Sequence, residues 1–362
     1  MDHAWIDGRP VDLRAACAEA ARLLQQSRLP LVAGLETDVA GARAAIALAQ
    51  RAGAVIDHMH SEALLHDLEV MRDAGMMTTT PSEAGLHADV LLLAGPVPHE
   101  EWPQLAPAMR DKGSQSMIWL CPERADRSGT VSEAKMPAIG RKPDDLPALL
   151  AALRVTLAGR PVERAPVPAK ALAKLAAQLQ AARFGVAVWS AATLDALTIE
   201  MLCGLIKDLN AKTRFSGLSS LPPSYNALGV LQVCGWMSAF PPRTGFARGF
   251  AEHDPWRFET RRLVASGEVD CVVWISAFGS GRPPWTHGVP MISLTNAHAS
   301  LSHQGVHIAV GRPGLDHDAV AYLRAAGTLT WTDATATRTT IRVSDALNQI
   351  AAALPASVRT SC

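Results

Sequence analysis

The sequence has no excess of charge of either sign. Its 362 residues include 34 Lys and Arg residues and 34 Asp and Glu residues, so the formal net charge is zero. Proteins that bind duplex nucleic acid normally carry a basic excess, so we expect no nucleic-acid partner. Hydrophobic residues make up 48% of the chain and charged residues 19%, which excludes a disordered or fibrous protein. The length predicts a globular protein of about two or three domains.

Long hydrophobic runs are also missing. No apolar run approaches the roughly 18 residues of a membrane-spanning helix. The first residues, Met1 to Trp5, lack the basic and then apolar order of a signal peptide. We therefore expect no membrane association and a cytoplasmic location.

Closely spaced cysteines are absent. The six cysteines lie far apart in the chain: Cys17, Cys121, Cys203, Cys234, Cys271 and Cys362. Zinc sites and iron–sulfur clusters usually draw on cysteines a few residues apart, so neither is predicted from the spacing. Scattered cysteines in apolar segments are typical of reduced, buried thiols in a cytoplasmic protein.

What the sequence does contain is an alternation of short apolar strands and amphipathic helices. An apolar run at 29–35, a helix over 39–52 that Asp38 begins and Gly53 ends, and a second run at 54–57 predict a βαβ unit with parallel strands. Further strands are expected at 88–95, 116–121, 184–190, 269–276, 289–295, 306–310 and 328–332, and helices at 11–26, 102–112, 146–157, 169–182, 193–210 and 343–354. The pattern predicts an α/β fold with mostly parallel sheets in two Rossmann-like lobes.

Residues 215–257 break this alternation. They are rich in Gly, Pro, Ser, Phe and Trp, which predicts long loops of the kind that carry function or contacts. Five aromatic residues crowd this region: Trp236, Phe240, Phe246, Phe250 and Trp256. Two interpretations stay open, packing in the core and a protein–protein interface, where Trp and Phe are enriched.

Motifs with recognisable chemistry are weak. Gly279-Ser280-Gly281 and the segment 311–314 are glycine-rich but complete no phosphate-binding motif, so a simple turn and an anion site that uses Arg282 or Arg312 both remain open. No GxSxG segment is present, and we expect no catalytic triad.

The histidines give a second weak signal. His58 and His60 follow a predicted strand at the spacing with which amidohydrolases begin a metal site, and on a strand both rings would face the same way. His303, His307 and the segment 316–318 are the other candidates. Solvated or capping roles are the alternative for each of these groups.

Several short segments together resemble a known family. They are Trp5-Ile6-Asp7-Gly8, Val32-Ala33-Gly34-Leu35, Gly53-Ala54-Val55-Ile56-Asp57, Lys207-Asp208-Leu209-Asn210, Gly245-Phe246-Ala247-Arg248-Gly249 and, as the best match, Tyr225-Asn226-Ala227-Leu228-Gly229-Val230-Leu231-Gln232-Val233-Cys234-Gly235-Trp236. The chain is similar over nearly its whole length to the B subunit of formylmethanofuran dehydrogenase, in the molybdopterin oxidoreductase superfamily. The resemblance implies a truncated form of that architecture, with one lobe formed by residues 1–60 and 221–362 and the other by 61–220.

The chain departs from the redox members of this family in two places. Those members carry a tungsten or molybdenum bis-pterin centre and a [4Fe–4S] cluster held by a cysteine-rich segment, whereas Cys17 here stands alone in a predicted helix. The resemblance places their metal-ligating cysteine near Ala63, and a methyl group cannot ligate a metal. We therefore expect no cofactor and no metal in this chain. An active tungsten or molybdenum enzyme remains the alternative, with Ser61, Glu62 or the nearby histidines as ligands.

A non-redox branch of the family fits these losses. The chain looks like the B subunit of the bacterial formyltransferase/hydrolase complex, in which a formyl group passes from tetrahydromethanopterin to a furan-type carrier and is released as formate. The resemblance implies a structural subunit without catalytic residues, whose partners are a formyltransferase-like subunit, an amidohydrolase-like subunit and the C subunit of the same complex. Four arginines are candidate contacts for an anion or for the carrier: Arg243, Arg248, Arg282 and Arg312. A hydrolase built on His58 and His60 is a third hypothesis.

Overall fold

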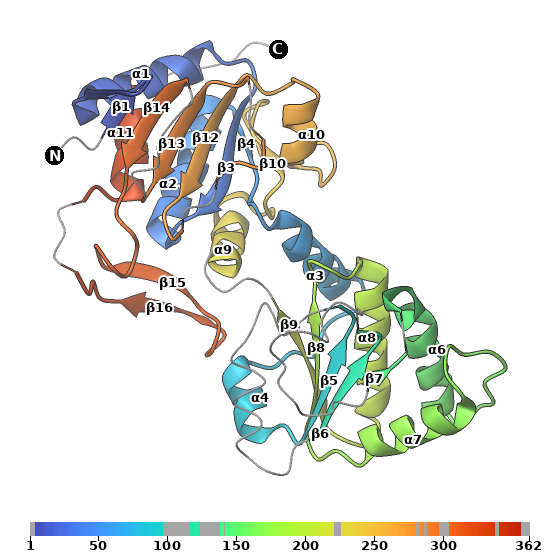
Figure 1. Ribbon diagram of the computed structural model, residues 1–362. Coiled ribbons are helices and arrows are strands. Elements are labelled where there is room, and N and C mark those ends of the chain that lie inside the picture. The colour runs from blue at the N-terminus through green and yellow to red at the C-terminus, as the bar shows by residue number, and fades with distance from the viewer. Residues whose placement is uncertain are drawn as a thin grey trace. The chain divides into compact units, whose positions relative to one another are not determined.

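The chain forms two compact units in the computed structural model (Figure 1). Unit 1 comprises Met1–Ser61, Ser224–Leu323 and Thr328–Cys362, and unit 2 comprises Glu62–Pro223 and Arg324–Gly327. The structure describes residues 4–96, 116–122, 138–140, 142–220, 226–279, 282–285, 288–296, 304–336 and 340–355. The predicted helix at 102–112 lies outside these ranges.

Unit 1 is built on a nine-stranded sheet in the order β11-β10-β4-β3-β12-β13-β14-β1-β2. Its five central strands are parallel: β4 (Val55–Ile56), β3 (Pro30–Glu36), β12 (Cys271–Ser276), β13 (Met291–Thr295) and β14 (Gly305–Ala309). The outer strands are antiparallel: β10 (Thr244–Gly245) and β11 (Glu252–His253) at one edge, β1 (Ala4–Ile6) and β2 (Arg9–Val11) at the other.

Helices cover both faces of this sheet, which explains why its central strands are continuously apolar. The helices of unit 1 are α1 (Leu13–Gln26), α2 (Val39–Ala52), α9 (Ala227–Ser238), α10 (Thr260–Ala265) and α11 (Val343–Ala353). Val273 and Ile275 of β12 pack into the core formed with α1, α2 and α11. Val272 and Trp274, which point to the other face, pack with Phe258 and Leu263 beside α10.

The helix boundaries follow the capping residues in the sequence. The Asp38 side chain accepts a hydrogen bond from the Gly41 backbone N–H at 2.9 Å at the start of α2, and Asp12 accepts one from the Ala15 N–H at 2.8 Å at the start of α1. Gly53, with φ +64°, ends α2 at the predicted residue.

Unit 2 is a smaller five-stranded sheet in the order β7-β6-β5-β8-β9, and all of its strand pairs are parallel. Its strands are β5 (Val90–Ala94), β6 (Ser116–Leu120), β7 (Ala138–Ile139), β8 (Gly185–Ser190) and β9 (Phe215–Ser220), and its helices are α3 (Ser61–Asp73), α4 (Pro81–His87), α6 (Leu146–Leu157), α7 (Ala169–Gln180) and α8 (Ala196–Leu209), with a 3₁₀ turn at Pro143–Asp145. Figure 1 shows α6, α7 and α8 together beside the sheet and α4 on its other side. The predicted α/β class with mostly parallel sheets is confirmed.

The prediction of long loops over 215–257 was wrong. This segment contains β9, α9, β10 and β11. Its glycines and prolines led to a prediction of loops, although they lie in or between short elements. Packing stabilises these elements: Val230, Val233 and Cys234 of α9 are fully buried. A hairpin of β15 (Ala319–Leu323) and β16 (Thr328–Thr332) was foreseen only in its second strand. In the part of the chain that the structure describes, no helix has both the length and the hydropathy needed to cross a membrane.

Candidate functional site

The carboxyl ends of β3 and β12 meet in unit 1 where the chain order of the sheet reverses. From β3 the chain proceeds to β4 on one side, whereas β12, on the other side, leads to β13 and β14. Open α/β sheets bind ligands at such a reversal, outside the carboxyl ends of the strands. Glu36 is the last residue of β3 and Ser276 is the last of β12, so both stand at this point.

Glu36 has an unusual environment for a carboxyl group. Its side chain is completely buried. The Ser276 hydroxyl donates a hydrogen bond to Oε2 at 2.5 Å, while Oε1 makes no hydrogen bond within the described residues. Burial raises the pKa of Glu36 to about 7, and the Ser276 hydrogen bond and the Arg312 charge act against this rise. A carboxyl group that changes its charge near neutral pH therefore lies at the reversal point.

Arg243, the first of the four predicted arginines, makes contacts within unit 1. Only 11% of its side chain is exposed, and its Nε lies 3.8 Å from Oδ1 of Asp57. It donates from Nη1 to the Pro255 carbonyl oxygen at 2.8 Å, and its Nη2 lies 4.0 Å from Glu259. The arginine holds the segment after β11 against the end of β4.

The other three arginines are exposed but stand in different places. Arg248 pairs with Glu252 at 3.4 Å and lines a small pocket with Leu29 and Val55, at the amino ends of β3 and β4. Arg282 lies beyond β12, next to residues 280 and 281 that the structure does not describe. Arg312 follows β14 and lines an open cleft at the carboxyl end of the sheet.

The loop from Asp57 to Ser61 does not have the geometry that the His58–His60 spacing suggested. β4 ends at Ile56, so the two histidines are not on a strand. The His60 backbone N–H donates to Nδ1 of His58 at 3.0 Å, and the two ring centroids lie 5.7 Å apart with the planes tilted by 42°. Burial lowers the pKa of His60, which favours its neutral form. Within the described ranges, no three His, Cys, Asp or Glu residues are placed to hold a metal ion together.

Residues near the expected tungsten or molybdenum ligand do not fit that role. Ala63 is buried in the first turns of α3 and offers only a methyl group. The Ser61 hydroxyl is engaged with the His58 backbone nitrogen at 3.0 Å, and the Glu62 side chain is 62% exposed beside His66 at 3.7 Å. Burial also raises the pKa of the five described cysteines, so none is a thiolate at neutral pH.

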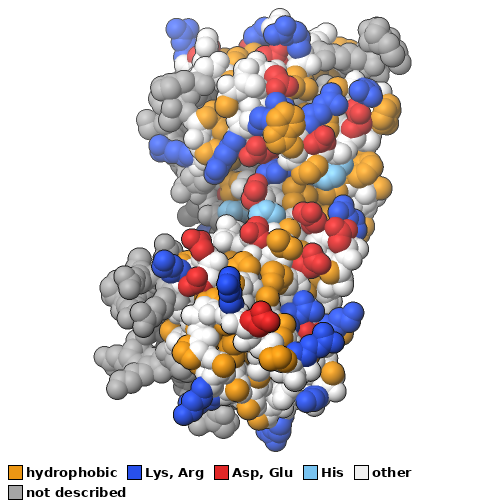
Figure 2. All heavy atoms as spheres, turned by 90° about the vertical axis from the view of Figure 1, so that its right-hand side faces the viewer, with side chains coloured by type: hydrophobic (Ala, Val, Ile, Leu, Met, Phe, Trp, Pro, Cys, Tyr) orange, Lys and Arg blue, Asp and Glu red, His pale blue; other side chains and the backbone are white. Residues whose placement is uncertain are grey.

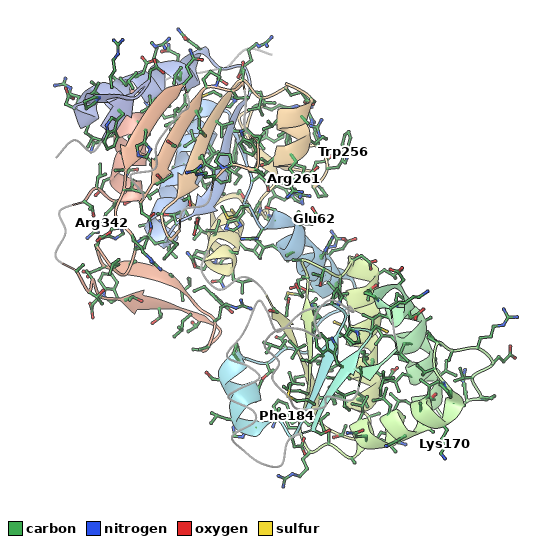
Figure 3. All side chains as sticks on the ribbon, viewed as in Figure 1. Glu62, Lys170, Phe184, Trp256, Arg261 and Arg342 are labelled. Atoms are coloured by element: carbon green, nitrogen blue, oxygen red, sulfur yellow. The ribbon has the colours of Figure 1, made fainter. Side chains whose placement is uncertain are left out.

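The crowded aromatic residues of the segment 236–256 separate into two groups. Phe246 is buried in the core of unit 1. The other four are exposed, and we call them the aromatic edge: Trp236 (64% exposed) on α9, Phe240 (38%), and Phe250 (58%) and Trp256 (71%), which precede and follow the outer strand β11 in the chain. The Phe240 ring stacks on that of His253 in β11, with the centroids 6.1 Å apart. Figure 2 faces the side of unit 1 that carries α10, where hydrophobic side chains lie at the surface among charged ones, and Figure 3 shows Trp256 projecting outward beside α10. Exposed aromatic groups of this kind mark protein-contact surfaces.

Asn226 is a residue whose role the sequence did not indicate. It begins α9 with φ +49°, donates from Nδ2 to the Thr37 carbonyl oxygen at 2.8 Å and accepts at Oδ1 from the Tyr322 N–H at 2.8 Å. It therefore connects the loop after β3 to β15. This contact is a structural role for the sequence segment 225–236, which resembles the family best. The only available signal was its place in that segment.

The remaining candidates are scattered. His307 lies buried in β14, where its Nδ1 is 2.9 Å from the Ser293 hydroxyl and its ring is 5.2 Å from that of Trp5. His317 is buried and donates from Nδ1 to the Asp318 carbonyl oxygen at 3.0 Å. His303, Ser280 and Gly281 lie outside the described residues.

Comparisons with known proteins agree on one family. No protein-family profile matches the chain. It is 33% identical over 320 residues to the B subunit of the formyltransferase/hydrolase complex Fhc of Methylorubrum extorquens, a match that covers 86% of this chain and 85% of the relative. It is 27% identical over 289 residues to the B subunit of the tungsten-containing formylmethanofuran dehydrogenase 2 of Methanocaldococcus jannaschii, which covers 75% of this chain and 65% of that one.

A solved structure supports the same assignment. The crystal structure of the FhcABCD complex from Methylorubrum extorquens with methylofuran contains a chain that is 30% identical, with a TM-score of 0.85, and the match covers 96% of this chain and 98% of that one. Both the sequence and the fold thus match along nearly the full length. The chain belongs to the family of the B subunits of formyltransferase/hydrolase complexes, which is related more distantly to the B subunits of formylmethanofuran dehydrogenases.

Proposed function

We propose that the chain is a non-redox structural subunit of a formyltransferase/hydrolase complex. Such a complex transfers a formyl group from tetrahydromethanopterin to a furan-type carrier and releases it as formate. The observation that carries the proposal is the match over nearly the whole chain to a component of a complex of this name, whose structure was solved with methylofuran. Transfer and hydrolysis would then take place on partner subunits, one formyltransferase-like and one amidohydrolase-like, with the C subunit completing the assembly.

The donor groups of the chain support the absence of a cofactor. The resemblance to the redox members implies a tungsten or molybdenum ligand near residue 63, where the side chain of this chain is a buried alanine. An iron–sulfur cluster needs thiolates in close array, whereas the five described cysteines are free, buried and held as thiols. Free thiols also suit the reducing cytoplasm, where we expect the protein to work.

The aromatic edge supports an assembling role. The four side chains of the aromatic edge are exposed, and Trp and Phe are typical of residues that dominate binding between subunits. We expect this surface to be covered by another component of the complex.

Co-purification tests the proposal directly. The chain is tagged in a host that expresses the other subunits, and the associated chains are identified by mass spectrometry. We expect formyltransferase-like and amidohydrolase-like chains in fixed stoichiometry, and a tagged chain that elutes alone under mild conditions would contradict the proposal.

Variants of the aromatic edge refine this experiment. Phe250→Ser and Trp256→Ser, combined in one chain, should lower the yield of partner chains because they remove apolar contact area without touching the core. Leu197→Ser is the matched control, because Leu197 is 66% exposed on α8 in unit 2. An equal loss in both variants would show that the aromatic edge has no special part in assembly.

A further inference from the structure

An open cleft of about 460 Å³ lies in unit 1 at the carboxyl end of the sheet. Its walls are Phe278, which follows β12, residues 312–315, which follow β14, and the base of the β15–β16 hairpin at Ala319, Ala321 and Thr332. The volume lies within the range of small-molecule sites. We call it the Arg312 cleft.

Arg312 gives this cleft a positive group. Its backbone N–H donates to Oδ2 of Asp316 at 2.8 Å, which fixes the loop after β14. Its side chain is exposed and makes no hydrogen bond or ion pair within the described ranges. A guanidinium carries five N–H donors in a planar array that matches a carboxylate or a phosphate. Arg312 thus lines a cleft at the ligand-binding end of the sheet, whereas Arg248 lies at the amino ends of β3 and β4.

Two buried acceptors lie near lining residues of the cleft, although neither Glu36 nor His317 is itself a lining residue. Oε1 of Glu36 has no hydrogen-bond partner in the described part of the chain, and it lies 3.0 Å from where a Cβ on Gly279, the neighbour of Phe278, would stand. Nε2 of His317, between the lining residues Leu315 and Ala319, is likewise buried and unpaired there. Because its Nδ1 donates to a carbonyl oxygen, the neutral ring presents Nε2 as an acceptor.

These groups together have the character of a binding site. A buried polar atom without a partner destabilises the folded state, and folded proteins retain few such atoms. An N–H or O–H group of a ligand would satisfy such an acceptor, and an anionic group would pair with Arg312. Phe278 and Pro313 add apolar surface beside the charge.

We propose that the Arg312 cleft binds a small organic anion that also carries an N–H or O–H donor. The proposal goes beyond the structural role proposed above, which assigns no ligand to this chain. It is tested on the full-length chain alone, so a failure of partner association would leave it standing.

The first experiment is a calorimetric titration with N-acetyl-L-glutamate, which has two carboxylates and one N–H donor. Sulfate is titrated in parallel, since it has the charge without the donor. We expect N-acetyl-L-glutamate to bind more tightly than sulfate. We also expect Arg312→Ala to weaken its binding by about ten-fold or more, and Arg312→Glu to abolish it. Arg248→Ala, which removes an exposed arginine at the amino ends of β3 and β4, should leave the affinity unchanged. Thermal melting of each variant confirms that it is folded.

Three results would contradict the proposal or a part of it. No binding by the wild-type chain, or equal affinities of the wild type and Arg312→Ala, would overturn the site. Sulfate binding as tight as that of N-acetyl-L-glutamate would overturn the part of the proposal that concerns the donor.

The second experiment identifies the source of the anion. Small molecules are released by denaturation from the purified chain and from the purified complex, for the wild type and for Arg312→Ala, and are compared by mass spectrometry. An anion that the substitution removes from both preparations is a free metabolite, and one that it removes only from the complex is a carrier that arrives with the partner subunits. Both outcomes support the site, whereas identical contents of the wild type and the variant contradict it.

Discussion

Among single residues, Glu36 has the most unusual environment, because its carboxyl group is buried at the end of β3. The Glu36 side chain is fully buried and one of its oxygens has no partner among the described residues, so its charged form is costly, and burial raises its pKa to about 7. Sequence alone could not predict this, because Glu36 reads as an ordinary polar residue at the end of a strand. Its state depends on Ser276 and Arg312, which are distant in sequence and which the sheet brings close.

The pH dependence of stability should expose Glu36. Between its ordinary pKa of 4.5 and about 7, the folded protein binds more protons at this site than the unfolded chain does. The free energy of unfolding therefore falls as the pH rises through this window and is constant above it, as far as Glu36 is concerned.

Glu36→Gln removes this pH dependence of stability because the glutamine side chain has no ionisable group. We expect the variant to gain on the wild type across the window, up to about 3 kcal/mol above pH 7 at roughly 1.4 kcal/mol per pKa unit. Urea unfolding at several pH values measures the difference. A constant difference at all pH values would show that the carboxyl group is not neutralised by burial.

Gly229 belongs to the segment that matches the family best, and the structure explains why it is a glycine. A Cβ at this position would stand 2.2 Å from Oδ1 of Asn226, the atom that accepts from the Tyr322 N–H. Gly229→Ala should destabilise the chain by about 2 kcal/mol through this overlap. Gly235→Ala on the same helix is the control: nothing lies within 4 Å of its Cβ position, so it should be neutral or stabilising. Equal melting temperatures of the two variants would contradict the role of Asn226.

At the scale of elements, the sequence predicted what local patterns determine. The helix over 39–52 has its predicted ends because Asp38 and Gly53 are strong capping residues, and β3, β8 and β12 were visible as apolar runs. The two-residue strands β10 and β11 were missed, since their pairing depends on β4 and not on their own residues. The anchoring of this region by Asp57 and Arg243 was missed for the same reason.

Asp57 should hold the edge of unit 1 together. Its Oδ2 accepts from the Thr260 N–H at 2.9 Å at the start of α10, and its Oδ1 faces Arg243. Asp57→Ala removes both interactions and leaves the Arg243 side chain with less compensation for its charge. We expect faster amide hydrogen exchange over residues 244–265, measured by mass spectrometry. Asp73→Ala, which loses only an exposed pair with Arg72, is the control, and equal exchange in the two variants would contradict the anchoring role.

For the whole molecule, the resemblance to a known family predicted more about function than composition or hydrophobic periodicity could. The α/β class followed from alternating patterns, but the family followed from short segments such as those around Asn226, and the matches to known proteins confirmed it. The arrangement of the Arg312 cleft could not be predicted, because its residues come from separate loops and a hairpin. The aromatic edge was predicted as one of two alternatives, and exposure separated Phe246 from the rest.

We propose that the chain supports a complex and handles no electrons. Elemental analysis of the purified complex by inductively coupled plasma mass spectrometry, with the chain quantified by amino-acid analysis, is the decisive test of this proposal. We expect tungsten and molybdenum far below one equivalent per chain and no iron–sulfur absorption in the visible spectrum. Stoichiometric tungsten or molybdenum released together with a pterin would overturn the proposal and would favour an active formylmethanofuran dehydrogenase.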